Sequence, residues 1–176
     1  AYEISTRDWS SDVCSSDLER LATRFWPGPL TLIVERSADV DPVVSGGLGT
    51  VAIRCPAHEL CLQLLRSLSA PVAAPSANRF GRVSPTCAQH VVDDLGSDVD
   101  FVLDGGACEV GLESTIVDCT VDPVQILRPG AITEEEIRSV LNATAPASGP
   151  SRASGMLESH YAPRCRVVAV ADRDEA

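Results

Sequence analysis

The chain has 176 residues, of which 44% are hydrophobic, and a formal net charge of −11. This length predicts one ordinary domain with a packed core and part of another. The acidic balance argues against a broad nucleic-acid-binding surface, which needs clustered Lys and Arg. No apolar run reaches the roughly 18 residues of a membrane span, so we expect a cytoplasmic protein without a membrane segment. Seven cysteines without a Cys-x-x-Cys pair predict reduced thiols and no metal site.

The N-terminal stretch does not read like the rest of the chain. Residues 10–18 are SSDVCSSDL, a near-repeat of Ser-Ser-Asp with neither helical nor strand periodicity. The part DVCSSDL is also one translated frame of a common sequencing adapter. We therefore expect residues 1–18 to be a non-native segment that stands in place of a missing N-terminal part. The alternative is a polar loop.

After this stretch the sequence alternates between helical and strand patterns. LERLATRF (18–25) has helical spacing and stops at the two prolines of WPGP. LTLIVE (30–35) and TVAIRC (50–55) are predicted strands. Pro56 is predicted as the first position of the next helix, and APVAAP (70–75) as a short buried strand.

The second half of the chain continues this alternation. Ser84-Pro85 predicts the N-cap and the first position of a helix. FVLDGG (101–106), STIVDCT (114–120) and VQILRPG (124–130) are predicted strands. Residues 133–136 (TEEE) form a capping box that predicts the helix ITEEEIRSVL.

Interleaved strands and helices predict an α/β fold with a twisted, mixed sheet covered by helices. Residues 142–154 (NATAPASGPSRAS) have the composition of a linker, and RCRVVAVAD further on reads as the first strand of a new unit. We therefore divide the chain into a partial domain at 19–141, a linker at 142–163 and the start of a truncated domain at 164–176.

The loop VAAPSANRFGRVSPT (72–86) places two arginines and several hydroxyls in one turn-rich connection. Backbone N–H groups at a helix start favour an anion, and Ser76 and Asn78 can point the same way in the PSAN turn. With Arg79 and Arg82 beside them, the loop is able to cradle a phosphate. The alternative is an ordinary surface turn before a capped helix.

Three strand ends carry polar side chains that suit a ligand site. In TVAIRC, alternation places Val51 and Ile53 on one face and Arg54 on the other, and Arg is seldom buried without a carboxylate or phosphate partner. Residues 113–115 of GLESTIVD open a strand, and Arg128 ends one before a Pro-Gly turn. Such groups gather at ligand crevices in α/β sheets. The alternatives are strand-end arginines that reach solvent and a simple strand-start turn.

Six motifs occur in a fixed order: FWPGPLTLIV, TVAIRCP, APSANRFGRVSPT, GLESTIVD, ILRPGAIT and GMLESHYAP. Together they resemble the threonylcarbamoyl-AMP synthases, the YrdC-like family, in the longer form with a linker and a second domain. The resemblance implies a YrdC-like fold with a concave ligand-binding face. It also implies that L-threonine, bicarbonate and ATP give threonylcarbamoyl-adenylate and pyrophosphate. The product would pass to tRNA threonylcarbamoyl transferase proteins, and no stable direct tRNA binding by this chain is expected.

The resemblance also implies roles for individual residues. Arg54 would pair with the threonine carboxylate, a task suited to the forked guanidinium, and Ser114 and the backbone of Ala74 would line the same pocket. The ATP-binding residues implied in this way are Thr50, Ser76, Ser84, Arg128 and Tyr161, the last from the HYAP motif. Mg²⁺ would ride on the ATP phosphates. No residue is an obvious nucleophile or general base, so we expect catalysis by positioning and charge stabilisation.

The sequence departs from the family pattern at two places. The family's N-terminal part, which includes ATP-contacting Lys and Arg, is absent where residues 1–18 stand, and Ser154 precedes Gly155-Met156 where Pro is usual. Two alternative functions are an RNA-binding YrdC-like module and a carbamoyltransferase of hydrogenase maturation. The negative charge disfavours the first, and the absence of cysteine-rich zinc motifs from the sequence disfavours the second.

Overall fold

The computed structural model describes residues 2–3, 15–141 and 144–146; Tyr161 lies outside them. The helices of this part are α1 (Ser15–Phe25), α2 (Glu59–Leu68), α3 (Ala88–Leu95) and α4 (Glu134–Val140), with short 3-10 helices at Pro42–Ser45 and Gly96–Asp98. Its strands are β1 (Tyr2–Glu3), β2 (Leu30–Glu35), β3 (Thr50–Arg54), β4 (Val72–Ala73), β5 (Thr115–Asp118), β6 (Gln125–Arg128) and β7 (Ala145–Pro146). Among the described helices, none is long and apolar enough to cross a membrane.

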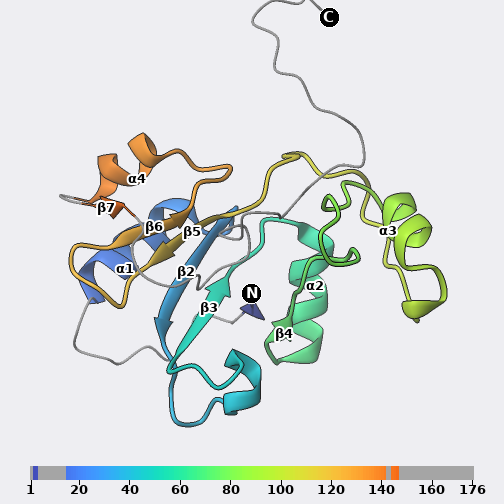
Figure 1. The fold of residues 1–176 in the computed structure, drawn as a ribbon, viewed down its shortest axis with the longest axis horizontal. Coiled ribbons are helices and arrows are strands. Elements are labelled where there is room, and N and C mark those ends of the chain that lie inside the picture. Colours follow the sequence, from blue (N-terminus) through green and yellow to red (C-terminus); the bar gives the residue numbers. More distant parts are fainter. Residues whose placement is uncertain (1, 4–14, 142–143, 147–176) are drawn as a thin grey trace, which may run out of the picture.

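The strands form one mixed sheet in the order β4-β1-β3-β2-β5-β6-β7, which confirms the predicted α/β class. β2 is antiparallel to β3 and parallel to β5, and β5 is antiparallel to β6. Because of these directions, β2 and β5 start, and β3 and β6 end, at the same end of the sheet (Figure 1). We call it the site end.

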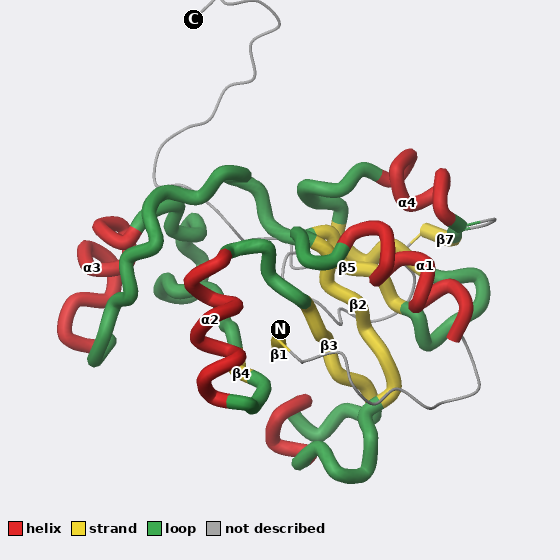
Figure 2. The backbone as a smooth tube through the Cα atoms, turned by 180° about the vertical axis from the view of Figure 1, so that it is seen from behind, coloured by secondary structure: helices red, strands yellow, loops and turns green. Residues whose placement is uncertain are grey.

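One face of the sheet is closed by α1 and α4, and Figure 2 shows α1 lying over the strands on this side. Alternate strand residues point towards these helices because side chains along a strand alternate between faces. The cluster contains Leu21 of α1, Ile137 of α4, and Leu30, Leu32, Val34, Val51, Ile53 and Val117 of the strands. Burying one such side chain contributes about 1.5–3 kcal/mol, so this layer holds the sheet in place.

The opposite face, which we call the polar face, has a smaller apolar cluster of Ile33, Ile116 and Leu127 with Ala52 beside it. Burial along β3 alternates: Val51 and Ile53 are buried, and Thr50, Ala52 and Arg54 are half-buried. The predicted placement of Arg54 opposite Val51 and Ile53 is therefore confirmed. Arg54 shares the polar face with Ala52.

The predicted capping box at the start of α4 is confirmed. Glu136 N–H donates to the Thr133 hydroxyl (3.2 Å), and Thr133 N–H donates to Glu136 Oε2 (2.8 Å). Two hydrogen bonds from Thr133 hold the pKa of Glu136 below its ordinary value. The one from the backbone N–H has the larger effect, and the one from the hydroxyl has the smaller. Since the pKa is lowered because these hydrogen bonds stabilise the ionised carboxylate, the box supports folding above the ordinary Glu pKa. That support fades as the pH falls through the lowered pKa.

Two predicted helix starts are wrong. α2 begins at Glu59 rather than Pro56, with an extended His58 as its N-cap. α3 begins at Ala88, and its N-cap is Cys87 rather than Ser84. The serine hydroxyl does not reach the helix because it donates to a carboxylate 29 residues further along the chain.

Two predicted strands also differ from the structure. β4 was expected to be buried, yet Ala73 is exposed, because β4 is the outermost strand next to β1. Residues 101–106 form no strand, and Phe101 is 91% exposed. The apolar residues favour a strand, but the segment does not pair with any strand of the described sheet.

Candidate functional site

The WPGP segment (26–29) links two strands at the site end. Gly28 N–H donates to the Cys55 carbonyl (2.9 Å), and Thr115 N–H donates to the Pro29 carbonyl (3.0 Å). The segment therefore fixes the end of β3 and the start of β5 relative to each other. Side chains at these two strand ends are held at a constant spacing.

Arg54 ends β3 on the polar face and is half-buried. Its Nε donates a hydrogen bond to the Gly28 carbonyl (3.1 Å). Among the described residues, no other hydrogen bond of the Arg54 side chain is seen. Nε thus anchors one edge of the guanidinium, and the N–H groups of the two terminal nitrogens make no hydrogen bond to the described residues. A planar, permanently charged group held in this way suits a carboxylate or a phosphate.

Ser114 lies at the centre of a buried polar cluster. Its Oγ is 2.8 Å from Thr31 Oγ1 and accepts a hydrogen bond from Arg128 Nη2 (3.0 Å). Arg128 also donates to the Ser114 carbonyl from Nε (3.1 Å) and Nη2 (2.7 Å). The three residues are 2–9% exposed. Buried groups that are hydrogen-bonded to one another keep fixed orientations, so Arg128 presents its charge from a rigid position.

Glu113 connects this cluster to the loop before α3. The Ser84 hydroxyl donates to Glu113 Oε1, and Oε2 of the same carboxylate is 3.6 Å from Arg128 Nη2. The side chain of Glu113 is 35% exposed and that of Arg128 11%. The carboxylate therefore lies between two residues that the family resemblance assigns to ATP.

The turn after β6 packs tightly against the start of β5. A Cβ on Gly130 would lie 2.4 Å from the Glu113 carbonyl oxygen, 2.6 Å from Thr115 N and 2.7 Å from Ser114 C. All three are backbone atoms, which cannot move aside like the end of a side chain. The absence of a side chain at this glycine is what allows Arg128 and Ser114 to meet.

Gly130→Ala is expected to lower the free energy of unfolding by about 1–3 kcal/mol, the range for overpacking a tight contact. Gly49→Ala is the matched control, because no atom lies within 4 Å of the Cβ built there. Urea unfolding of both variants measures the difference. Equal stability of the two variants would show that the Gly130 contact relaxes freely.

The structure brings part of the predicted site together. Arg54, Ser114 and Arg128 lie at the site end, and Ser84 joins them through Glu113. Of the other predicted residues, Thr50 begins β3 about 13 Å from Arg54 at about 3.3 Å per residue. Ala74 and Ser76 are exposed in the segment after β4, and their part in the site stays a prediction.

Two residues with a part in the site were not assigned a role from the sequence. Thr31 is buried against Ser114, and Glu113 joins Ser84 to Arg128. The signal for Thr31 was present, because it is the one polar residue inside the apolar run LTLIV. The loop arginines form ion pairs of their own, Arg82 with Asp94 of α3 and Arg79 with Asp98 just after it, and phosphate binding by this loop stays a prediction.

The local charge suits an anionic ligand. Among the described side chains that contact one another or the WPGP segment here, two cations, Arg54 and Arg128, accompany one carboxylate, Glu113, although the whole chain is acidic. In the described residues, no group of three or more His, Cys, Asp or Glu side chains is arranged to hold a metal ion. The site end can therefore bind a carboxylate or phosphate through guanidinium and hydroxyl groups.

Comparison with known proteins extends this picture. The family model of Sua5, YciO and YrdC proteins, described as telomere recombination, matches residues 5–130. The model of the threonylcarbamoyl-AMP synthase C-terminal domain matches residues 132–176. Together they span most of the chain.

Individual relatives agree with both matches. The threonylcarbamoyl-AMP synthase of Pyrococcus abyssi is 44% identical over 161 residues, 88% of this chain and 47% of that protein. The Bacillus subtilis enzyme of the same name is 45% identical over 150 residues, 81% of this chain and 43% of that protein. The crystal structure of P. abyssi Sua5 complexed with L-threonine is 40% identical, with a TM-score of 0.84, and the match covers 92% of this chain and 51% of that one. The chain thus spans about half the length of these relatives, and it belongs to the Sua5/YciO/YrdC family.

Proposed function

We propose that this chain carries the threonine- and ATP-binding domain of an L-threonylcarbamoyladenylate synthase. Its relatives in P. abyssi and B. subtilis are named threonylcarbamoyl-AMP synthase, and its structural neighbour is a complex with L-threonine. The observation that carries the proposal is the convergence of Arg54, Ser114 and Arg128 at one end of the sheet. Such a convergence suits a ligand with a carboxylate and a second ligand with phosphates.

In the proposed complex, Arg54 binds the threonine carboxylate. The anchored Nε and the donors at its terminal nitrogens support this role, because an arginine fork can give a carboxylate two parallel hydrogen bonds. Ser114 contributes its hydroxyl and Ala74 its backbone to the same pocket. Bicarbonate is proposed to bind beside the threonine amine, because these two groups react with each other.

ATP is proposed to contact Arg128, Ser84, Ser76 and Thr50, together with Tyr161 from the linker. Arg128 and Ser84 share the Glu113 carboxylate. Since two anions on one guanidinium repel each other, the phosphates must displace this carboxylate or reach it through a cation.

Mg²⁺ is proposed to enter with the ATP phosphates. Mg²⁺ is usually held by one or two carboxylates together with substrate phosphates rather than by a cage of protein ligands, and no cage of three such ligands occurs in the described residues. Glu113 is the carboxylate beside Ser84 and Arg128 that would supply a ligand. Bound there, the ion would neutralise charge on the departing pyrophosphate.

The proposed reaction forms a C–N bond and an O–P bond, and it breaks a C–O bond of bicarbonate and the link between the α- and β-phosphates. The threonine amine attacks the carbon of bicarbonate to give a carbamate and water. A carbamate oxygen then attacks the α-phosphorus, and pyrophosphate leaves. The protein's part is to align the reactants and to stabilise negative charge with Arg54 and Arg128. No side chain needs to form a covalent intermediate.

The product, threonylcarbamoyl-AMP, is proposed to pass in the cytoplasm to tRNA threonylcarbamoyl transferase proteins. The net charge of −11 supports transfer of the small molecule rather than stable tRNA binding by this chain.

The intact protein is expected to release pyrophosphate from ATP only when L-threonine and bicarbonate are both present, because the carbamate is the attacking group. A coupled pyrophosphate assay with each substrate omitted in turn measures this, and mass spectrometry identifies the adenylate. Equal pyrophosphate release without threonine would contradict the proposed function.

A further inference from the structure

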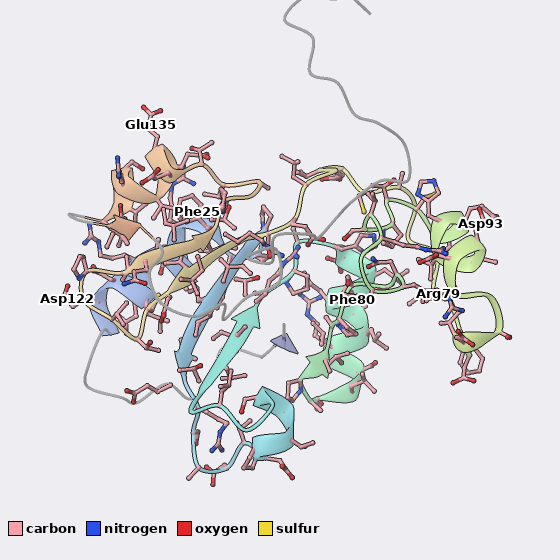
Figure 3. All side chains as sticks on the ribbon, in the orientation of Figure 1. Phe25, Arg79, Phe80, Asp93, Asp122 and Glu135 are labelled. Carbon is pink, nitrogen blue, oxygen red and sulfur yellow. The ribbon has the colours of Figure 1, made fainter. Side chains whose placement is uncertain are left out.

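The turn between Ser76 and Ser84 is tied to the region of α3 by two arginines, Arg79 and Arg82. Figure 3 shows Arg79 lying against this region. The turn itself is closed by a hydrogen bond from Arg82 N–H to the Arg79 carbonyl (3.1 Å). Both flanking serines are proposed ATP contacts, so whatever fixes this turn also fixes the approach of the nucleotide.

Asp94 on α3 holds both ends of the turn with its two carboxylate oxygens. Oδ2 accepts the Arg79 backbone N–H (2.7 Å), and Oδ1 accepts the Arg82 guanidinium. The Asp94 side chain is only 14% exposed, compared with 42% for that of Arg82. A mostly buried carboxylate with a donor on each oxygen is a strong and directional contact, because charge-assisted hydrogen bonds strengthen away from water.

Further contacts make the turn rigid. Arg79 Nε donates to the Asp94 carbonyl (3.1 Å), and its Nη2 donates to Asp98 Oδ2 (2.5 Å). From inside the turn, Asn78 Nδ2 donates to the carbonyls of Arg79 (3.1 Å) and Arg82 (2.9 Å). The two arginines and the two aspartates cancel in charge. The turn therefore offers a phosphate no net positive charge while its side chains stay paired.

We propose that Asp94 is a positioning residue for ATP, acting through the Arg79–Arg82 turn to place Ser76 and Ser84. The proposal rests on the proposed ATP-binding role of this loop. Arg82 then acts through Asp94 and does not bind the phosphates. The competing arrangement, in which ATP draws Arg82 away from Asp94, predicts a different pattern of mutational effects.

A double-mutant cycle separates the two arrangements. Asp94→Asn, Arg82→Gln and the double variant are made in the intact protein, and the Kd of ATP and of threonine is measured by calorimetry for each. Because the two residues act as one unit, each single change is expected to weaken ATP binding about tenfold. The double variant should bind ATP no more weakly than the weaker of the two single variants. Threonine affinity should stay within about twofold of wild type, as expected for a distant, independent contact.

The opposite pattern would overturn the proposal. If Arg82 binds phosphate directly, Arg82→Gln weakens ATP binding strongly while Asp94→Asn leaves it unchanged or tightens it, because the guanidinium is released. ATP affinity unchanged in all three variants would likewise overturn it. Equal losses for ATP and threonine would show a general loss of structure. If Asp94→Asn fails to fold, Asp94→Glu takes its place in the cycle, because it keeps the charge but displaces the carboxylate oxygens that hold Arg79 and Arg82. Weaker ATP binding by Asp94→Glu would then support the proposal, and unchanged or tighter ATP binding would overturn it.

A matched control comes from α4, where Arg138 and Glu134 form an exposed ion pair (2.6 Å) outside the site. Glu134→Gln with Arg138→Gln removes the same charges and should leave ATP affinity unchanged. The pyrophosphate assay on the wild type keeps the two proposals apart. A wild type that binds ATP without forming the adenylate would overturn the proposed function and leave the cycle interpretable. A wild type that does not bind ATP would overturn both.

Discussion

Replacing Arg128 with alanine is expected to lower the free energy of unfolding by about 3–5 kcal/mol, the range for breaking a buried pair. The change should also abolish measurable ATP binding. The side chain is 11% exposed, donates three hydrogen bonds to Ser114 and lies 3.6 Å from Glu113. Its loss leaves the Ser114 carbonyl and the Glu113 carboxylate without their cation in a partly buried place. Urea unfolding and ATP titration measure the two effects.

The control for this variant is Arg138→Ala on α4. The Arg138 side chain is 60% exposed and pairs with Glu134, so its loss should change stability by no more than about 1 kcal/mol. If Arg128→Ala proves no more destabilising than Arg138→Ala, the buried cluster does not hold the site end together.

Replacing Arg54 with alanine is expected to weaken threonine binding by about 2–4 kcal/mol, the range for losing one side of a buried charge pair. ATP binding should change little. The reason is that Arg54 is the strand-end cation whose Nε is anchored on Gly28 while its remaining donors can meet a carboxylate. Calorimetric titration of each ligand measures the two affinities.

Arg54→Lys is the matched variant, because it keeps the charge and loses the forked donors. An affinity for threonine between those of wild type and Arg54→Ala is expected. Equal losses of threonine and ATP binding in Arg54→Ala would mean that the arginine supports the strand rather than binding the substrate.

The parts of the fold that depend on local patterns could be predicted from the sequence. The strand at 30–35 follows from a run of β-branched and apolar residues, and the alternation in β3 placed Arg54 on the polar face. The capping box at 133–136 needs only residues three positions apart. In each case the interacting groups are neighbours in the chain, so periodicity and capping chemistry suffice.

The errors arise where distant contacts decide the outcome. Ser84 has the sequence of an N-cap, but its hydroxyl is used by Glu113. The apolar run at 101–106 has no strand beside it, so its β propensity is not realised. A sequence pattern gives the local preference of a segment. The structure of these two segments is decided by residues distant in the sequence, which the local pattern does not include.

The candidate site shows the same division. Arg54, Ser114 and Arg128 were found from polar residues at strand ends, whereas the contact of Thr31 with Ser114 depends on the parallel pairing of β2 with β5. The close approach of Gly130 to the start of β5 likewise depends on sheet topology. Neither contact leaves a periodic signal in the sequence.

The meeting of four strand termini at the site end has a thermodynamic consequence. Segments near residues 28, 54, 114 and 128 come together there only when the chain is folded, so a ligand that touches several of them binds the native state and not the unfolded one. By mass action, a ligand at about 100 times its Kd adds about 2.7 kcal/mol to native stability. Threonine and ATP should therefore each raise the melting temperature with a logarithmic dependence on concentration, and slow amide exchange most in β3 and β5.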